Sequence, residues 1–180
     1  MNHSVPLSLP DISEKEINLV SNVIRSGWLA HGEWNKKFET AFSRFVGVKN
    51  STTMNSCTSA LEIALKVNEI KGEVIIPSMT WCATANAVVN AGAKPVFCDV
   101  ESNTRNVSSK TISPLINSNT EAIIVVHFGG QTCNMDEIIK LTKKHKLLLI
   151  EDSAETLGGT WKKKKAGSFG IGCFSFFPTK

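Results

Sequence analysis

The chain has 180 residues, of which 42% are hydrophobic, and it carries a formal net charge of +4 at pH 7. This length and apolar content suit one large domain with a packed core, or part of a larger protein. Much of the positive charge comes from Lys162 to Lys165, which we interpret as the solvated tip of a hairpin from Trp161 to Ala166. No aromatic residues are interleaved with these lysines, so the sequence argues against a nucleic-acid partner.

Cysteine usage and hydropathy indicate a cytoplasmic protein with no membrane partner. The cysteines are odd in number, scattered and without a C-x-x-C pair, which suits reduced thiols better than a disulfide framework or a zinc site. We therefore expect no metal site. The first ten residues lack a basic patch followed by an apolar core, which argues against a signal peptide. The longest apolar runs, such as Ala122 to Val126, are far too short to span a bilayer.

Residues 1–50 are expected to form an N-terminal helical segment. Ser13 and Glu16 make a capping-box pattern at the start of a first helix, and Gly47 ends a second one. Between the two helices, Gly27 and Trp28 open a loop with no obvious core role. This loop is a candidate substrate-binding loop, or a turn with a packed tryptophan.

Residues 51–180 show strands alternating with helices. Ser51 to Asn55 is expected to be a short extended piece. The predicted strands that follow cover Glu73–Ile76, Lys94–Val100, Ala122–His127, Leu147–Ile150 and the apolar residues from Phe174 to Phe177. These strands are apolar throughout rather than alternating, which predicts a three-layer α/β/α fold with a mostly parallel sheet covered on both faces.

A helix start at Ser56, Cys57 and Thr58 is a candidate anion site. Small and hydroxyl residues there leave backbone N–H groups free, and the helix dipole favours a negative charge such as a phosphate. An ordinary N-cap by Ser56 or Thr58 is the alternative interpretation.

Several polar or aromatic residues follow predicted strands, at the sheet edge where open α/β proteins bind ligands. Trp81 could offer a flat ring to a flat ligand, or belong to the core. His127 could contact a ligand, or cap a loop. Asp152 comes directly after the most apolar strand, so it needs a cationic ligand group unless it caps a turn. Lys180 follows an apolar run whose walls would disfavour the charged form of its amine.

One ligand requires all these groups for its binding and chemistry. Pyridoxal 5′-phosphate needs N–H and O–H donors for its phosphate, including a hydroxyl such as that of Ser175. It also needs a stacking face, a carboxylate at its pyridine nitrogen and a lysine at its aldehyde. A nicotinamide-type Rossmann fold has no support, because no G-x-G-x-x-G follows the first strand, and no P-loop is present.

The chain resembles the DegT/DnrJ/EryC1/StrS family of sugar aminotransferases, which are fold-type-I pyridoxal phosphate enzymes with an aspartate-aminotransferase-like large domain. The similarity covers nearly the whole sequence. Some perosamine-synthase-like members are similar to this chain at the position of Glu155. The matching segments are Gly27-Trp28, Phe38-Glu39, Asn55 to Leu61, Pro77 to Trp81, Ala83 to Val88, Gly92 to Phe97, Glu151 to Glu155 and Phe174 to Lys180.

The resemblance implies a role for each candidate. It makes Lys180 both the residue that forms the Schiff base and the base that moves the substrate proton, and Asp152 the partner of the pyridinium nitrogen. Trp81 would stack on the cofactor ring. Phosphate contacts would come from Ser175 and the helix start at Ser56, Cys57 and Thr58. Glu155 lies where many members place Gln or His near the phenolic oxygen of the cofactor. Two smaller departures are Cys57, where Gly or Ala is usual, and Asn134, where Asp is usual.

The implied reaction moves an amino group from L-glutamate to a keto group of a nucleotide-linked sugar. Three alternative functions stand beside this one. A dehydratase of the same superfamily would carry His in place of Lys180. Another amino acceptor, such as a cyclitol or an aminobenzoate precursor, remains open. A non-catalytic domain that keeps only the fold is the third.

Family members extend well beyond the position of Lys180 and add a smaller C-terminal domain. We therefore expect this chain to be an N-terminal portion, with an incomplete cofactor-binding domain over residues 51–180. The resemblance also implies a homodimer with the site at the subunit interface, where the Trp28 loop could serve the partner's site.

Overall fold

The structure is a computed structural model that describes residues 8–180. The prediction that the first ten residues form no signal peptide therefore lies largely outside the described residues. The helices are α1 (Glu14–Arg25), α2 (Glu33–Val46), α3 (Cys57–Val67), α4 (Cys82–Asn90), α5 (Ser109–Ile112) and α6 (Met135–His145), with short 3-10 turns η1 (Ser113–Leu115) and η2 (Phe128–Gly130). The strands are β1 (Glu73–Pro77), β2 (Lys94–Cys98), β3 (Thr120–Val126), β4 (Leu148–Asp152), β5 (Thr160–Trp161), β6 (Lys164–Lys165) and β7 (Ile171–Cys173).

The main sheet has the order β2-β1-β3-β4-β7, and all of its neighbouring strands run parallel. Successive side chains of a strand point to opposite faces. Ile75 and Ile123 accordingly enter one buried core, whereas Ile76 and Ile124 enter the other. This explains why the strands are apolar throughout and confirms the predicted parallel sheet.

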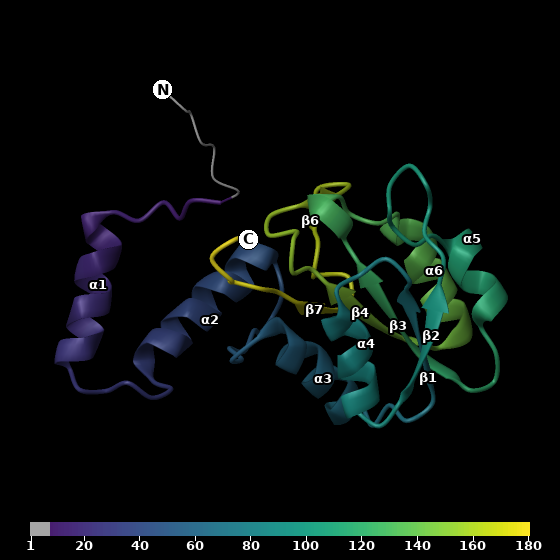
Figure 1. Cartoon of the computed structure of the whole chain (residues 1–180), viewed down its shortest axis with the longest axis horizontal. Helices are drawn as coiled ribbons and strands as arrows, with labels where there is room; N and C mark the ends of the chain where they lie inside the picture. The colour runs from purple at the N-terminus through teal and green to yellow at the C-terminus, as the bar shows by residue number, and fades with distance from the viewer. Residues whose placement is uncertain (1–7) are drawn as a thin grey trace.

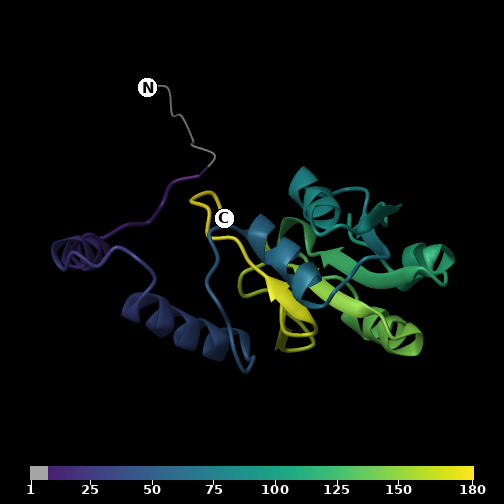
Figure 2. The same ribbon diagram turned by 90° about the horizontal axis from the view of Figure 1, so that it is seen from below.

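Helices cover both faces of the sheet (Figures 1 and 2). On one face, α3 and α4 pack through residues such as Leu65 and Val88. On the other, α5 and α6 pack through Ile112, Met135 and Ile138. The fold is thus the predicted three-layer α/β/α arrangement. Because all five strands run the same way, their carboxyl ends meet at one edge, where an open α/β sheet binds its ligands.

The first N-terminal helix begins, and the second ends, where the sequence predicts. Ser13 and Glu16 form the capping box of α1, and Gly47 ends α2 in the left-handed conformation. The predicted extended piece at residues 51–55 forms no strand. Its backbone is instead held by α2, because Glu39 accepts hydrogen bonds from both the amide and the hydroxyl of Thr53. The proposed boundary at residue 50 stays a prediction.

The prediction of a buried strand from Phe174 to Phe177 is wrong. The strand β7 ends at Cys173, and Phe176 and Phe177 are 55% and 65% exposed. Phe176 pairs edge-on with Phe38 and Phe42 of α2 instead of a sheet neighbour. Residues 171–173 thus form the strand, whereas the apolar residues after Cys173 leave the sheet and contact α2.

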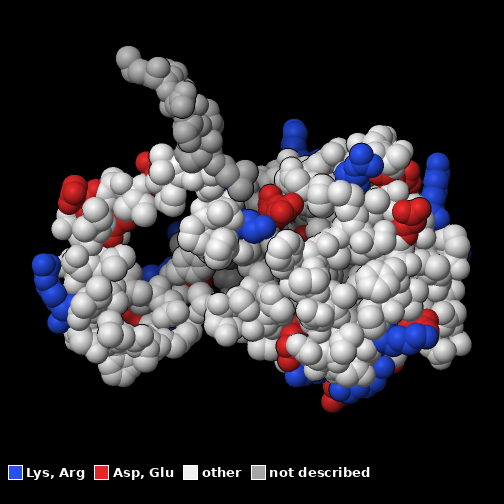
Figure 3. All heavy atoms as spheres, viewed as in Figure 1, with Lys and Arg blue, Asp and Glu red and all other residues white. Residues whose placement is uncertain are grey.

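The predicted lysine hairpin is present as the antiparallel pair of β5 and β6. Lys162 and Lys163 form its exposed tip, and Lys165 lies over the ring of Phe45. On the face shown in Figure 3, charged side chains of both signs are scattered rather than gathered into one basic patch. Within residues 8–180, no helix combines the length and hydropathy that crossing a membrane requires.

Candidate functional site

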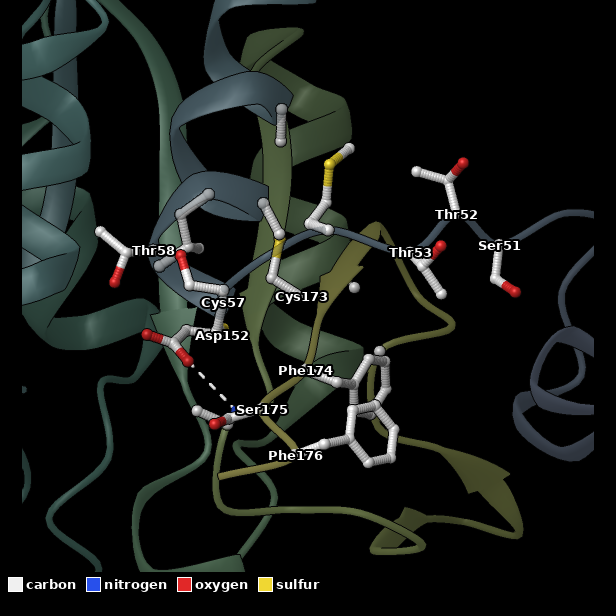
Figure 4. Close-up of a pocket in the computed structure, with 18 of the residues that line it drawn as sticks. Ser51, Thr52, Thr53, Cys57, Thr58, Asp152, Cys173, Phe174, Ser175 and Phe176 are labelled. Carbon is white, nitrogen blue, oxygen red and sulfur yellow. Dashed lines mark hydrogen bonds between the residues drawn. The ribbon is translucent and has the colours of Figure 1, made fainter. Parts of the chain in front are cut away.

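A cavity of about 1380 Å³ opens at the carboxyl edge of the sheet. Its walls come from α2, the start of α3, the end of β4 and the segment after β7. All the residues predicted to bind the cofactor line this one cavity: Ser56, Cys57, Thr58, Trp81, Asp152, Glu155, Ser175 and Lys180. Figure 4 shows how the start of α3, Asp152 and Ser175 face one another. The roles of these residues stay predictions, but the fold does bring them together.

The start of α3 offers free backbone donors to the cavity. Ser56 is the N-cap, and its hydroxyl oxygen accepts the amide hydrogen of Ser59. The amides of Cys57 and Thr58 come next, and neither donates a hydrogen bond within the described part of the chain. The helix dipole adds partial positive charge at this point. The N-cap and anion-site interpretations of this segment are therefore compatible, because one residue caps while the next two stay free.

Asp152 is buried at the end of β4, with only 6% of its surface exposed. One carboxyl oxygen accepts a hydrogen bond from the Thr84 hydroxyl at 3.0 Å, and the other accepts one from the Ala154 amide at 3.2 Å. Burial raises the pKa of Asp152, although these two hydrogen bonds act in the opposite direction. No lysine or arginine pairs with Asp152 among residues 8–180, so its charge suits a cationic ligand group.

The amine of Lys180 reaches the same cavity from the segment after β7. Its Nζ lies 3.3 Å from Oε1 of Glu155, and Oε2 of Glu155 accepts a hydrogen bond from the amide of Gly129 at 3.0 Å. Gly129 has a φ of +59°, in the left-handed region that glycine favours. Glu155 therefore ties the proposed reactive amine to the turn after β3.

Cys57 brings a thiol into the cavity. Burial raises its pKa to about 12, and the nearby carboxylate of Asp152 adds to this rise while Lys180 opposes it. The thiol is therefore protonated at neutral pH and is a poor nucleophile, because nucleophilic attack requires the thiolate. Only its backbone amide is suited to binding an anion.

Trp81 and Ser175 complete the cavity wall. Trp81 is the N-cap residue of α4 and is 78% exposed, so its ring is free to pack against a ligand. The Ser175 oxygen accepts a hydrogen bond from the amide of Phe177 at 3.3 Å. The hydroxyl proton of Ser175 is still available to donate.

Three of the predicted substrate contacts do not lie in this cavity. His127 is completely buried and hydrogen-bonds to Glu151 and to the Cys133 amide, so its side chain does not reach this cavity. Gly27 and Trp28 occupy the loop between α1 and α2, outside the residues that line the cavity. The indole N–H of Trp28 donates to the His31 carbonyl within its own loop.

Sequence reasoning missed Thr84 and Glu151. Thr84 lies in α4, and only the packing of this helix on β4 shows that its hydroxyl donates to Asp152. Glu151 enters the sequence analysis only as part of a segment that matches the family. A signal was present, because two consecutive carboxylates at the end of a buried strand must face opposite sides of the sheet, and both must then be satisfied.

A family model described as the DegT/DnrJ/EryC1/StrS aminotransferase family matches residues 10–180. The chain belongs to this family.

Relatives with known names agree with this assignment. The spore coat polysaccharide biosynthesis protein SpsC of Bacillus subtilis is 41% identical over 99% of this chain and 47% of its own length. Spr1654 from Streptococcus pneumoniae, solved in its PMP form, is 31% identical with a TM-score of 0.94, over 99% of this chain and 50% of its own. DesI, solved in the presence of its TDP-sugar product, is 30% identical with a TM-score of 0.90, over 98% of this chain and 46% of its own. The chain thus spans about half the length of these relatives.

The residues of this family member fit pyridoxal phosphate. Among residues 8–180, no lysine or arginine pairs with the buried carboxyl of Asp152 and no acceptor meets the amides of Cys57 and Thr58, and Lys180 lines the same cavity. Each of these groups meets one chemical need of the cofactor. The unusual Cys57 does not disturb the fit, because its thiol stays protonated and its amide is unaffected.

Proposed function

We propose that this chain forms the cofactor-binding half of a pyridoxal-phosphate-dependent aminotransferase that moves an amino group from L-glutamate to a keto group of a nucleotide-linked sugar. The observation that carries this proposal is one cavity lined by the amine of Lys180 and by the buried carboxyl of Asp152, which has no cationic partner within the described part of the chain. Solved PMP and PLP forms of Spr1654 and the TDP-sugar product of DesI support the cofactor and the substrate class.

The predicted cofactor-binding residues of the cavity have distinct tasks in this function. The amides of Cys57 and Thr58, with the hydroxyl of Ser175, bind the phosphate. Trp81 packs on the ring and keeps water from that side. Bound pyridoxal phosphate supplies an electron sink, which stabilises the negative charge left when a substrate carbon loses its proton.

Asp152 and Lys180 control the proton transfers and the covalent attachment of the cofactor. Asp152 keeps a proton on the ring nitrogen, because a carboxylate buried away from other cations strongly favours a cationic partner. Lys180 would hold the cofactor covalently through its amine. Once the amine of the amino donor has displaced it, the freed Nζ would accept the proton of the donor's Cα and later return it. Lysine at this position favours amino transfer over the dehydratase alternative.

The first experiment asks whether Lys180 forms the covalent attachment. The chain is incubated with pyridoxal phosphate, reduced with borohydride and digested, and the modified peptide is identified by mass spectrometry. We expect the label on Lys180 and its loss in Lys180→Ala. Lys163→Ala is the matched control, because Lys163 lies on the exposed hairpin tip. Equal labelling of many lysines, or of none, would contradict the cofactor proposal and favour a non-catalytic domain.

The second experiment tests the reaction and the assembly. The full-length gene product is assayed with L-glutamate and a panel of nucleotide-linked keto sugars, and its mass is measured by light scattering. We expect 2-oxoglutarate and an aminated nucleotide sugar from a homodimer. Turnover of a cyclitol or aminobenzoate precursor in place of every nucleotide sugar would refute the substrate class while leaving the cofactor site intact.

A further inference from the structure

Glu151 is a fully buried carboxylate that the proposed reaction does not use. Its oxygens accept hydrogen bonds from the amides of Gly167, Phe169 and Gly170 at 2.7–2.8 Å, and from Nε2 of His127 at 3.0 Å. The charge of Glu151 is thus stabilised by the backbone amides of residues 167–170, here called the arc, and by one imidazole, whereas no lysine or arginine of residues 8–180 pairs with it. Both carboxylate oxygens of Glu151 therefore have hydrogen-bond donors, as a buried carboxylate requires.

The hydrogen bonds around His127 fix its tautomer. The amide of Cys133 donates to Nδ1 at 3.2 Å, so Nδ1 carries no proton. The ring proton is therefore on Nε2, where it is donated to Glu151. The His127 carbonyl accepts a hydrogen bond from the Thr156 hydroxyl at 2.6 Å. Because both ring nitrogens make hydrogen bonds, to Glu151 and to the Cys133 amide, the imidazole cannot rotate without losing them.

The position of Glu151 links this network to the proposed active site. Glu151 and Asp152 are consecutive in β4, so their side chains point to opposite faces, one to the arc and the other to the cavity. The arc at residues 167–170 leads directly into β7, which pairs with β4 and continues to Ser175 and Lys180. The backbone is close enough that a Cβ on Gly170 would lie 2.3 Å from the Leu149 carbonyl oxygen.

We propose that Glu151, with His127, is a positioning residue that fixes the 167–170 arc against β4 and so holds Ser175 and Lys180 opposite Asp152. This inference rests on the proposed function for its link to the cofactor. The electrostatics agree with it. Burial alone raises the pKa of Glu151, but the hydrogen bonds from His127, Gly170 and Gly167 outweigh burial and lower the pKa, so Glu151 is a carboxylate at neutral pH.

The test compares Glu151→Gln with Ile138→Val, a core change in α6 on the same side of the sheet. Replacing the carboxylate by an amide turns one acceptor toward the arc into a donor. We expect faster hydrogen exchange at the amides of 167–170 and about tenfold weaker attachment of pyridoxal phosphate to Lys180, the equivalent of one charge-assisted hydrogen bond. Ile138→Val should lower the melting temperature without either local effect. Unchanged exchange and attachment in folded Glu151→Gln would overturn the proposal.

Two further measurements apply even if Glu151→Gln does not fold. In the unmodified protein, the amides of Gly167, Phe169 and Gly170 should exchange far more slowly than those of the exposed hairpin tip, and equal rates would overturn the proposal. His127→Gln keeps a donor toward Glu151, so pyridoxal phosphate should attach to Lys180 better in this variant than in His127→Leu. Equal attachment in the two variants would also overturn the proposal. If the unmodified protein forms no adduct at Lys180, it is the proposed function that fails, because the exchange rates do not depend on the cofactor.

Discussion

At the scale of single residues, Asp152 shows a conflict between stability and function. Its carboxyl is buried with a hydroxyl and an amide for partners but no cation among the described residues. Its pKa is raised by burial, so the folded protein binds the Asp152 proton more tightly than the unfolded chain does. The stability that this group contributes is therefore present at low pH and is lost as pH rises through its folded pKa. Residues with this behaviour often mark ligand sites.

A stability measurement checks this reading. We expect Asp152→Asn to raise the melting temperature of the cofactor-free protein at pH 7, because it removes a buried, unpaired charge while keeping a hydrogen-bonding group. The gain should shrink as pH falls and Asp152 itself becomes protonated. Thermal unfolding of both proteins between pH 4 and pH 8 would show it. A lower melting temperature for the Asn variant at pH 7 would mean that the carboxylate is better compensated than its contacts indicate.

The same residue should matter more for turnover than for cofactor binding. In the full-length gene product, Asp152→Ala is expected to lower kcat by at least about 100-fold, the usual cost of losing one electrostatic contact in the transition state. Cofactor affinity should fall much less, because the phosphate and Lys180 contacts remain. Steady-state kinetics with a cofactor titration separate the two effects. Near-normal turnover would show that Asp152 has no part in the chemistry.

At the scale of elements, the start of α3 is the clearest case of a local sequence signal that the fold puts to use. Ser56 satisfies one of the first amides of the helix, whereas Cys57 and Thr58 line the cavity and their amides have no acceptor within residues 8–180. The end of the chain is the opposite case. Phe174, Phe176 and Phe42 form edge-on aromatic contacts, so hydrophobicity after β7 marks contact with α2 and not a longer strand.

The cap of α3 is open to a direct test. Ser56→Ala should lower the free energy of unfolding by about 1 kcal/mol, the typical cost of losing an N-cap hydrogen bond. Ser56→Asn should restore most of it, because its side chain can accept the same amide hydrogen. Urea titrations of the three proteins measure the difference. Equal stability of the Ala and Asn variants would show that the hydrogen bond to Ser59 contributes little.

At the scale of the whole molecule, α1 and α2 lie to one side of the α/β body (Figures 1 and 2). The connection between the two parts is an aromatic cluster, in which Phe42 contacts Phe38, Phe45, Phe174 and Phe176. This cluster also lines the cavity through Phe38, Phe42, Phe174 and Phe176. The arrangement of the N-terminal helices and the position of the C-terminal segment therefore depend on one another.

Removing the central ring should separate the two parts. Phe42→Ala is expected to cost about 3 kcal/mol, at the low end for an aromatic-to-alanine change because Phe42 is only partly buried. Limited proteolysis should then cut near residues 48–55 and in the segment after β7 faster than in the unmodified protein. Ala41→Ser is the control, because Ala41 is an exposed neighbour on the same helix. Unchanged cleavage in Phe42→Ala would show that other contacts hold the parts together.

The layered fold follows from the amino-acid pattern alone, because uniformly apolar strands such as β3 can be buried only in a sheet covered on both faces. The chemistry of Lys180, Asp152 and the α3 start follows from the sequence as well, because these are properties of residue types and of helix ends. Which candidates come together depended on the packing of distant segments. Trp81 was expected at the cofactor and does line the cavity, whereas the substrate candidate His127 is buried and bonded to Glu151, and the indole of Trp28 bonds to His31 within its own loop. The reason is physical: hydrophobic pattern acts locally along the chain, whereas the contacts of a polar side chain depend on segments far away in the sequence.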